Sequence, residues 1–160
     1  MSALDPAARH RGRERAVQWL YQWELSGLDL DDVLSREHQV DVDPPDRERD
    51  AWAVDLVRGT AREMQRIDPL ITQHATNWRI ERMAVVDRVI LRLGVYELLQ
   101  NAPDAPPAVV IDEAVELART FSADQAVAFV NGVLDAVHRG LSEAATDGPT
   151  DGPADAPRSS

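Results

Sequence analysis

An all-α fold is predicted by three features of this sequence. Through most of the chain, apolar residues recur every three or four positions, which is the spacing of one face of an α-helix. Two proline-rich stretches, residues 41–50 and 101–108, separate these patterns and cannot continue a helix. The β-branched run Val109-Val110-Ile111 leads directly into a helical pattern and is too isolated to form a sheet.

The first predicted helix runs from about Ala7 to Ser26 and ends at Gly27, a residue type that often follows the last turn of a helix. At 3.6 residues per turn, Ala16, Leu20 and Trp23 share one face, which we expect to be buried. Arg9 and Arg13 lie above this apolar stripe, on the turn before it begins. The opposite, polar face carries Arg11, Arg15, Gln18 and Gln22.

Three shorter helical segments are expected before the middle of the chain. The first covers about residues 29–37. After the first proline-rich linker, Asp46 is placed to cap a helix over about residues 46–66. The pair Asp68-Pro69 has the form of a helix cap followed by proline at the first helical position, and it predicts a new helix through His74.

The most strongly apolar helical pattern covers about residues 84–100, and we expect this helix to be the central and most buried one. Arg92 is among the charged residues that mark its outer side. Glu97 falls at the edge of its apolar face, where a carboxylate must be hydrogen-bonded if it is buried. We therefore interpret Glu97 as a structural anchor rather than a general base.

Two further helices are expected after the second proline-rich stretch. One covers about residues 109–121. The other begins at Ser122, which forms a capping box with Gln125, and continues to about Leu141. The sequence thus predicts about seven helices.

The chain of 160 residues is expected to form one folded domain with two tails. Residues 1–8 are predicted to be flexible, and residues 9–142 to form the single all-helical domain. Residues 143–160 repeat Asp, Gly and Pro, which cannot form a packed core, so a disordered acidic tail is predicted.

The only basic stretch of this acidic chain lies at its start. The whole sequence carries a net charge of −11, made up of +2 in residues 1–15 and −13 in the rest. Four arginines stand at alternate positions of this basic segment: Arg9, Arg11, Arg13 and Arg15. A nucleic acid would be repelled elsewhere, so it would have to bind at this patch. Charge alone is equally compatible with a solvated, partly disordered amino terminus.

The composition excludes several other classes of function. There is no cysteine, and no lysine either, so every side-chain cation apart from histidine is an arginine. No apolar run approaches the ~20 residues that span a bilayer, and the first residues lack the apolar core of a signal peptide. We expect a soluble, cytoplasmic protein without a membrane partner.

No pattern of catalytic or metal-binding residues is evident. The four histidines are scattered, and no glycine-rich phosphate loop is present. Asp112, Glu113 and Glu116 could form a catalytic carboxylate pair, but acidic residues are common in the first turn of a helix. We predict that the protein is not an enzyme and holds no metal or cofactor.

Tyr21 lies off the centre of the apolar face of the first helix, near the arginines. An exposed aromatic ring beside arginines suits stacking on unpaired RNA bases. The alternative is that Tyr21 is a half-buried core residue with a hydrated hydroxyl. The sequence leaves both possibilities open.

Four segments, in order, resemble the NusB family of bacterial transcription antitermination factors. They are ARHRGRERAVQWLYQWELS, WRIERMAVVDRVILRLGVYEL, PAVVIDEAVELARTF and FVNGVLDAV. Each is largely a helix pattern, but together they cover the chain from about Arg9 to Val137. The resemblance implies a compact all-α fold of two small three-helix bundles without enzymatic activity.

The resemblance also implies an RNA-binding surface. Family members bind the boxA element of ribosomal RNA leaders together with NusE, a small ribosomal protein, and help RNA polymerase read through termination signals. Carried over to this sequence, the RNA-binding residues are Arg9, Arg11, Arg13, Gln18, Tyr21, Asp124, Gln125 and Phe129. Phe129 could equally be a core residue at helical spacing. The implied protein-partner side is an acidic face around Glu81 and Asp87.

Two departures from the family pattern concern the RNA edge. Ala126 and Ala128 stand where many members have a serine and a lysine, which removes a hydroxyl and a cation.

Two alternatives to the antitermination factor also follow from the sequence. One is the RNA-recognition module of a ribosomal RNA methyltransferase, for which this chain has no catalytic domain. The other is a protein-binding scaffold or homodimer that hides the arginine face.

Overall fold

The computed structural model describes residues 4–36 and 46–146. Within these ranges the chain forms seven α-helices and one short 3₁₀ turn, and no strand, which confirms the all-α prediction. No helix in the described ranges is long and apolar enough to cross a membrane. In chain order the elements are α1 (Pro6–Ser26), α2 (Leu30–Arg36), α3 (Arg47–Arg62), α4 (Met64–His74), η2 (Ile80–Arg82), α5 (Val85–Gln100), α6 (Pro107–Phe121) and α7 (Asp124–Thr146).

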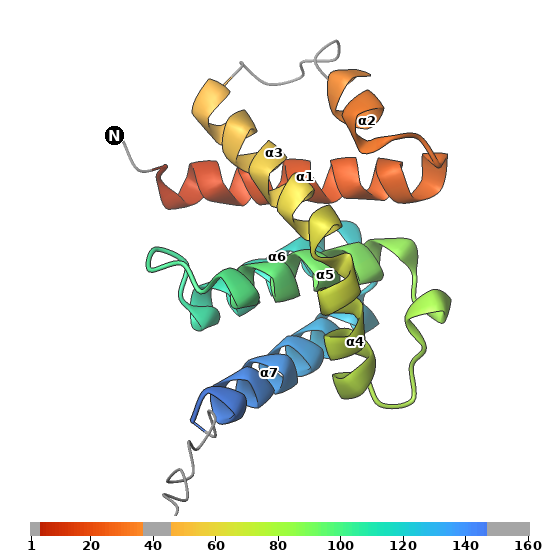
Figure 1. Cartoon of the computed structure of the whole chain (residues 1–160), viewed down its shortest axis with the longest axis vertical. Helices are drawn as coiled ribbons and strands as arrows, with labels where there is room; N and C mark the ends of the chain where they lie inside the picture. Colours follow the sequence, from red (N-terminus) through yellow and green to blue (C-terminus); the bar gives the residue numbers. More distant parts are fainter. Residues whose placement is uncertain (1–3, 37–45, 147–160) are drawn as a thin grey trace, which may run out of the picture.

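The helices form two groups that meet at α5 (Figure 1). In the first group, α1 packs on α3 and α2 lies against α1. In the second group, α6 and α7 pack on each other and on α5, and α4 lies against α5 and α7. Helix α5 also contacts α1 and α3, so it joins the two groups. Every residue from Val89 to Leu98 is buried, which confirms that this helix is the central one.

Helix α1 begins and ends at local signals in the sequence. The Asp5 carboxylate accepts a hydrogen bond from the backbone N–H of Ala8 at 2.7 Å, and Pro6 occupies the first helical position. Gly27 closes the helix in the left-handed conformation, at φ 68°, as predicted. The prediction that residues 1–8 are flexible is wrong for residues 6–8, which are helical; residues 1–3 lie outside the described ranges.

The break between α3 and α4 lies earlier than the sequence suggested. Asp46 caps α3 as predicted, through its carboxylate and the backbone N–H of Arg49 at 3.1 Å. The helix ends at Arg62 rather than at residue 66, and α4 starts at Met64, with Pro69 in its interior. The expected start at Asp68-Pro69 is wrong because the Asp68 carboxylate binds Arg92 of α5, at 2.9 Å.

Arg92, predicted on the outer side of α5, is instead a buried ion-pair residue. It contacts Asp68 of α4 and, at 3.1 Å, Glu24 of α1. Burial opposes its charge, but the two carboxylates outweigh that effect and raise the pKa of the guanidinium. These two ion pairs thus connect α1 and α4 to the central helix, α5.

The last helix differs from its prediction at both ends. It begins at Asp124 rather than at a capping Ser122, whose hydroxyl donates a hydrogen bond to Asp87. It continues through Thr146, so residues 143–146, predicted as part of a disordered tail, are helical. The rest of that predicted tail, residues 147–160, lies outside the described ranges, as do residues 41–45 of the first proline-rich linker.

A close contact at Gly59 sets the distance between α3 and α5. A Cβ atom built on Gly59 would lie 2.1 Å from the Tyr96 hydroxyl oxygen and 2.2 Å from the adjacent ring carbon. Any larger side chain would therefore collide with a buried aromatic ring. The glycine allows α5 to approach α3 closely.

Candidate nucleic-acid interface

The alternate arginines of α1 point in two opposite directions. Residues two apart on an α-helix are turned by about 200°, whereas residues four apart share a face. Arg9 and Arg13 therefore face the protein, toward α5 and the loop after it. Arg11 faces away from it, and Arg15, on the same side of the helix as Arg11, lies partly buried against the Trp19 ring. The basic segment is thus two separate pairs of arginines rather than one patch.

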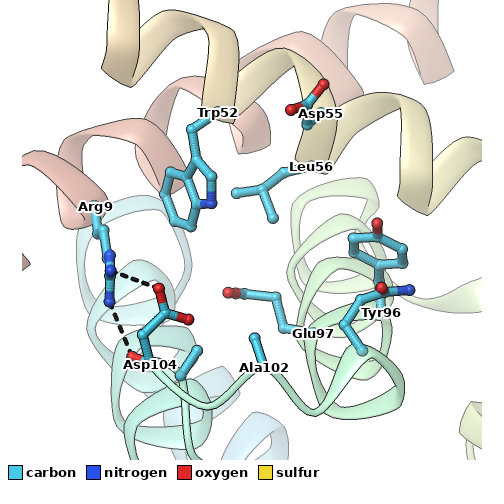
Figure 2. A pocket seen from close by; sticks show the side chains of 10 residues that line it. Arg9, Trp52, Asp55, Leu56, Tyr96, Glu97, Ala102 and Asp104 are labelled. Carbon is cyan, nitrogen blue, oxygen red and sulfur yellow. Dashed lines mark hydrogen bonds and ion pairs between the residues drawn. The ribbon is translucent and has the colours of Figure 1, made fainter. Parts of the chain in front are cut away.

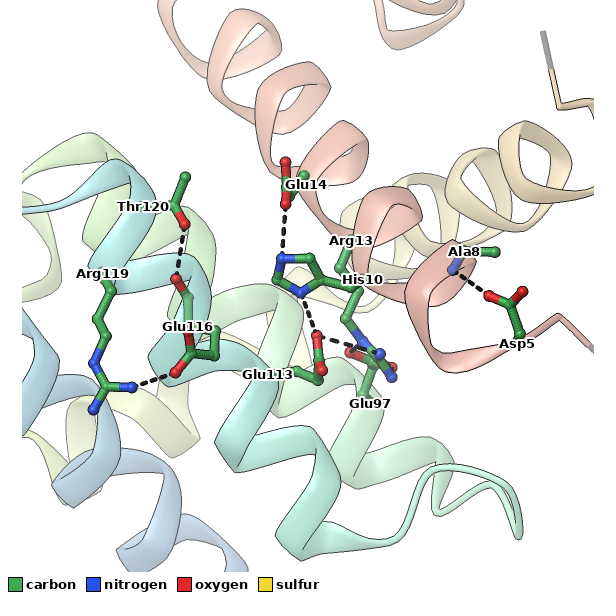
Figure 3. Close-up of polar contacts among 10 residues, drawn as sticks. All are labelled: Asp5, Ala8, His10, Arg13, Glu14, Glu97, Glu113, Glu116, Arg119 and Thr120. Atoms are coloured by element: carbon green, nitrogen blue, oxygen red, sulfur yellow. Dashed lines mark hydrogen bonds and ion pairs between the residues drawn. The ribbon is translucent and has the colours of Figure 1, made fainter. Parts of the chain in front are cut away.

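Arg13 is a buried structural residue. Its side chain is 2% exposed, and its guanidinium binds the Glu97 carboxylate through Nη2 at 2.8 Å and Nε at 2.9 Å (Figure 3). The same guanidinium lies over the Trp52 ring, 5.1 Å from its centroid. The predicted anchoring role of Glu97 is confirmed. In this conformation Arg13 has no surface to offer a phosphate, so its expected direct contact with RNA does not fit its position.

Arg9 occupies the rim of a cavity of about 190 Å³ between α1, α3 and the end of α5. Figure 2 shows it facing Asp104 of the loop between α5 and α6. It donates to the Asp104 carboxylate at 2.7 Å and to the Asp104 carbonyl oxygen at 2.9 Å. Since the Asp104 side chain is largely exposed, a phosphate could compete for this guanidinium.

His10 links α1 to α6. Its Nε2 lies 2.7 Å from Glu14, and its Nδ1 lies 2.7 Å from Glu113 (Figure 3). Glu113 also lies 3.8 Å from Arg13. Of the three acidic residues considered as a catalytic pair, Glu113 is thus part of a structural network, and Glu116 pairs with Arg119 on its own helix.

The outward arginines line a groove of about 140 Å³ on the surface of α1. Arg11 is exposed, and no carboxylate in the described part of the chain forms an ion pair with it. Arg15 is half-buried, with its guanidinium 5.2 Å from the centroid of the Trp19 ring. The remaining lining residues are Glu14, Gln18 and, from α3, Arg49. Arg49 was not identified in the sequence analysis, because its approach to α1 depends on how α3 packs.

A second, more apolar hollow of about 440 Å³ adjoins this groove. Tyr21 is 40% exposed, which favours the exposed over the half-buried alternative. Gln18 lines both the hollow and the groove, so the two are neighbours on α1. The hollow is lined by Val17, Gln18, Tyr21, Gln22, Val86 and Phe121.

The predicted residues of α7 lie at two different places. Asp124 and Gln125 are exposed in its first turn, directly after the end of α6. Phe129 is half-buried and packs against Trp78, with the ring centroids 5.7 Å apart. It does not line the Tyr21 hollow. Trp78 is 56% exposed, and the sequence analysis did not identify it as part of a surface.

The two acidic residues predicted for a protein partner differ in accessibility. Glu81 is exposed in η2. Asp87 is half-buried near the start of α5, where it accepts the hydrogen bond of Ser122. Within the described ranges, no group of three or more histidine or acidic side chains is arranged to hold a metal ion.

Comparisons with known proteins agree with the resemblance in the sequence. A model of the NusB family matches residues 10–139. The transcription antitermination protein NusB of Solibacter usitatus is 47% identical over 137 residues, which are 86% of this chain and 92% of that protein. The protein of the same name from Saccharopolyspora erythraea is 48% identical over 131 residues, which are 81% and 86% of the two chains.

Two solved structures share this fold. A NusB structure from T. maritima has a TM-score of 0.73 and 34% identity, and the match covers 87% of this chain and 93% of that one. A crystal structure of the antitermination factors NusB and NusE in complex with double-stranded RNA has a TM-score of 0.71 and 28% identity. That match covers 85% of this chain and 99% of the other.

Proposed function

Because this chain belongs to the NusB family, whose members are non-enzymatic transcription antitermination proteins, we propose that it binds the boxA element of ribosomal RNA leaders. It does so together with NusE, in the cytoplasm, and the complex supports read-through by RNA polymerase. A related NusB structure contains both NusE and RNA, which supports this choice of partners.

The observation that carries the proposal is the exposed Tyr21 ring, set in a hollow beside the outward arginines of α1. A flat exposed ring offers a stacking surface to an unpaired base, and the amide groups of Gln18 and Gln22 offer hydrogen bonds to its edge. Arg11 binds the phosphate next to the stacked base. The rest of this acidic chain repels RNA and so restricts binding to this face.

The other predicted RNA-binding residues contribute in different ways in this proposal, some by direct contact and one by supporting α1. Arg9 contacts RNA after exchanging Asp104 for a phosphate. Arg13 contributes by holding α1 in place rather than by touching RNA. Asp124 and Gln125 extend the surface past the end of α6, and Phe129 extends it through its packing with Trp78.

NusE is proposed to bind on the side of η2 and the start of α5. Glu81 is exposed there and can pair with a basic ribosomal protein. Asp87 acts less directly, because its carboxylate already holds Ser122 and the junction between α6 and α7. The two surfaces adjoin at this junction, which allows RNA and NusE to bind together.

The proposal is tested by measuring the affinity for a boxA-containing RNA and for a scrambled RNA of equal composition, with and without NusE. Wild type should prefer boxA, and NusE should strengthen binding. Tyr21→Ala should weaken boxA binding by about 5-fold to 150-fold, the range expected for one lost base stack. Arg139→Gln, which changes an exposed residue on α7 paired with Asp135, is the control for a substitution away from this face and should bind boxA like wild type.

Equal affinity for boxA and scrambled RNA, with NusE present, would overturn the proposal. Sedimentation analysis in the same buffer then addresses the remaining alternative. A dimer whose formation is weakened by Tyr21→Ala would instead indicate a protein-binding role in which the arginine face is covered by a second copy.

A further inference from the structure

The groove beside Arg11 is built from two helices, and its third arginine comes from a part of the chain 34 positions beyond Arg15. Arg49 stands in the first turn of α3 and is 7% exposed. Its Nε and Nη2 both donate to one oxygen of Asp50, at 3.2 Å. The guanidinium is therefore held along one edge by a single carboxylate oxygen, and its opposite edge is turned away from that carboxylate.

Gly12 brings Arg49 to α1. A Cβ atom on Gly12 would lie 2.7 Å from the Trp52 ring and 3.6 Å from Cγ of Arg49. Only a residue without a side chain lets the first two turns of α3 lie this close to α1. The aliphatic stem of Arg49 thus crosses α1 next to Arg11.

The charge of the groove is positive. Its lining contains three arginines, Arg11, Arg15 and Arg49, against two carboxylates: Glu14 in the lining and Asp50, which is bound to Arg49. Glu14 lies 2.7 Å from His10 of the preceding turn. Planar guanidinium groups that converge from two helices match the oxygens of a phosphate, to which each can donate two hydrogen bonds.

We infer that Arg11, Arg15 and Arg49 bind one phosphate of the RNA backbone, adjacent to the base that stacks on Tyr21. This inference rests on the proposed function, since it assigns a ligand group to the same face. Gln18 lines both the groove beside Arg11 and the hollow beside Tyr21, so a nucleotide can place its phosphate in the groove and its base in the hollow. The phosphate contact fixes the register of the RNA on α1 and carries no base specificity.

The test measures boxA affinity as a function of salt for wild type, Arg11→Gln, Arg49→Gln and the double variant. Each single substitution should weaken binding by about 10-fold, as expected for a lost hydrogen bond between charged groups. It should also lower the salt slope by up to about 0.7, the value for one phosphate contact on a single strand. Because both arginines hold the same phosphate, the double variant should lose much less than the product of the two effects.

The control is Arg58→Gln, which removes the same charge from the same helix at an exposed residue paired with Asp31. It should bind boxA like wild type. Asp50→Asn provides a test that does not depend on the stability of an arginine variant. It releases Arg49 from its carboxylate and should raise affinity about 2-fold to 5-fold, a gain that misfolding cannot produce.

The outcomes separate this inference from the proposed function. Wild-type binding that prefers boxA, with Arg49→Gln equal to Arg58→Gln and no gain in Asp50→Asn, would overturn the phosphate site alone. Additive losses in the double variant would show that the two arginines contact different phosphates, which also contradicts it. Absence of boxA preference in wild type would instead reject the proposed function.

Discussion

Arg13 of α1 and Glu97 of α5 form an ion pair inside the protein, in which Nη2 and Nε of Arg13 lie 2.8 and 2.9 Å from the Glu97 carboxylate oxygens, on the side of α1 opposite the exposed Arg11. The two residues are 84 positions apart in the chain. Helix α1 thus has one face that holds the fold together and another that is free to bind a ligand. Substitutions on the two faces should have separable effects.

Arg13→Ala should lower the free energy of unfolding by about 3–5 kcal/mol, because Glu97 would remain buried without a partner. The double variant Arg13→Met/Glu97→Leu should recover much of this loss, since no buried charge remains. Urea denaturation followed by circular dichroism measures both. Arg11→Ala, at an exposed position of the same helix, should change the stability by no more than about 0.5 kcal/mol. A loss at Arg11 equal to that at Arg13 would contradict the assignment of the two faces.

Asp104→Asn should increase affinity for boxA RNA, because it weakens the contact that Arg9 must give up to reach a phosphate. We expect a gain of about 2-fold to 5-fold with a stability change below about 1 kcal/mol, since the pair is at the surface. Asp135→Asn removes the same charge from an exposed pair on α7 and serves as the control. An equal gain in both variants would mean that only overall charge matters.

Gly59→Ala should destabilise the protein by about 1–3 kcal/mol, because its new methyl group would overlap the Tyr96 ring. Gly132→Ala is the matched comparison, since no atom lies within 4 Å of a Cβ at that position of α7. It should be neutral or stabilise the helix by up to about 1 kcal/mol. In thermal unfolding, the melting temperature of Gly59→Ala should fall, whereas that of Gly132→Ala should stay the same or rise, if α3 and α5 approach each other this closely.

Tyr96 should ionise at a higher pH than an ordinary tyrosine. Burial raises its pKa above the usual value of 10.0, because the phenolate is poorly solvated. The neutral form is favoured by the fold, so the corresponding stability is present below pH 10 and is lost as the pH rises through the raised pKa. Absorbance at 295 nm in Tyr21→Phe, which leaves Tyr96 as the only tyrosine, follows this ionisation. The same variant unfolded in guanidinium chloride should titrate at the ordinary value.

Helical periodicity was sufficient to predict the fold class, the central position of α5 and the role of Glu97 as a structural anchor. These depend on local spacing, on the caps at Asp46 and Gly27, and on the length of the apolar stretch. It misplaced Arg92, because a charged residue on a helix can be covered by carboxylates from other helices. Here those carboxylates come from Glu24 and Asp68, which no local pattern connects to α5.

The candidate site shows the same limit. Four arginines at alternate positions indicated a basic patch, but the sequence could not show that α5 supplies a buried partner for Arg13. Arg49 lay in a segment read as a linker and helix start, and only the packing at Gly12 brings it to α1. Tyr21 and Gln18, both named by the family resemblance, line one hollow because they lie three positions apart on a single helix.

The pairing of Arg13 with Glu97 also has a consequence for the order of events during synthesis. Helix α1 leaves the ribosome first, but Arg13 has no buried partner until 84 more residues have been added. At about 5–20 residues per second, this delay lasts about 4–17 seconds. During this time a basic segment without its docking partner is present near the ribosome. Helix α1 is therefore held in place by this ion pair only after α5 has been synthesised, late in translation.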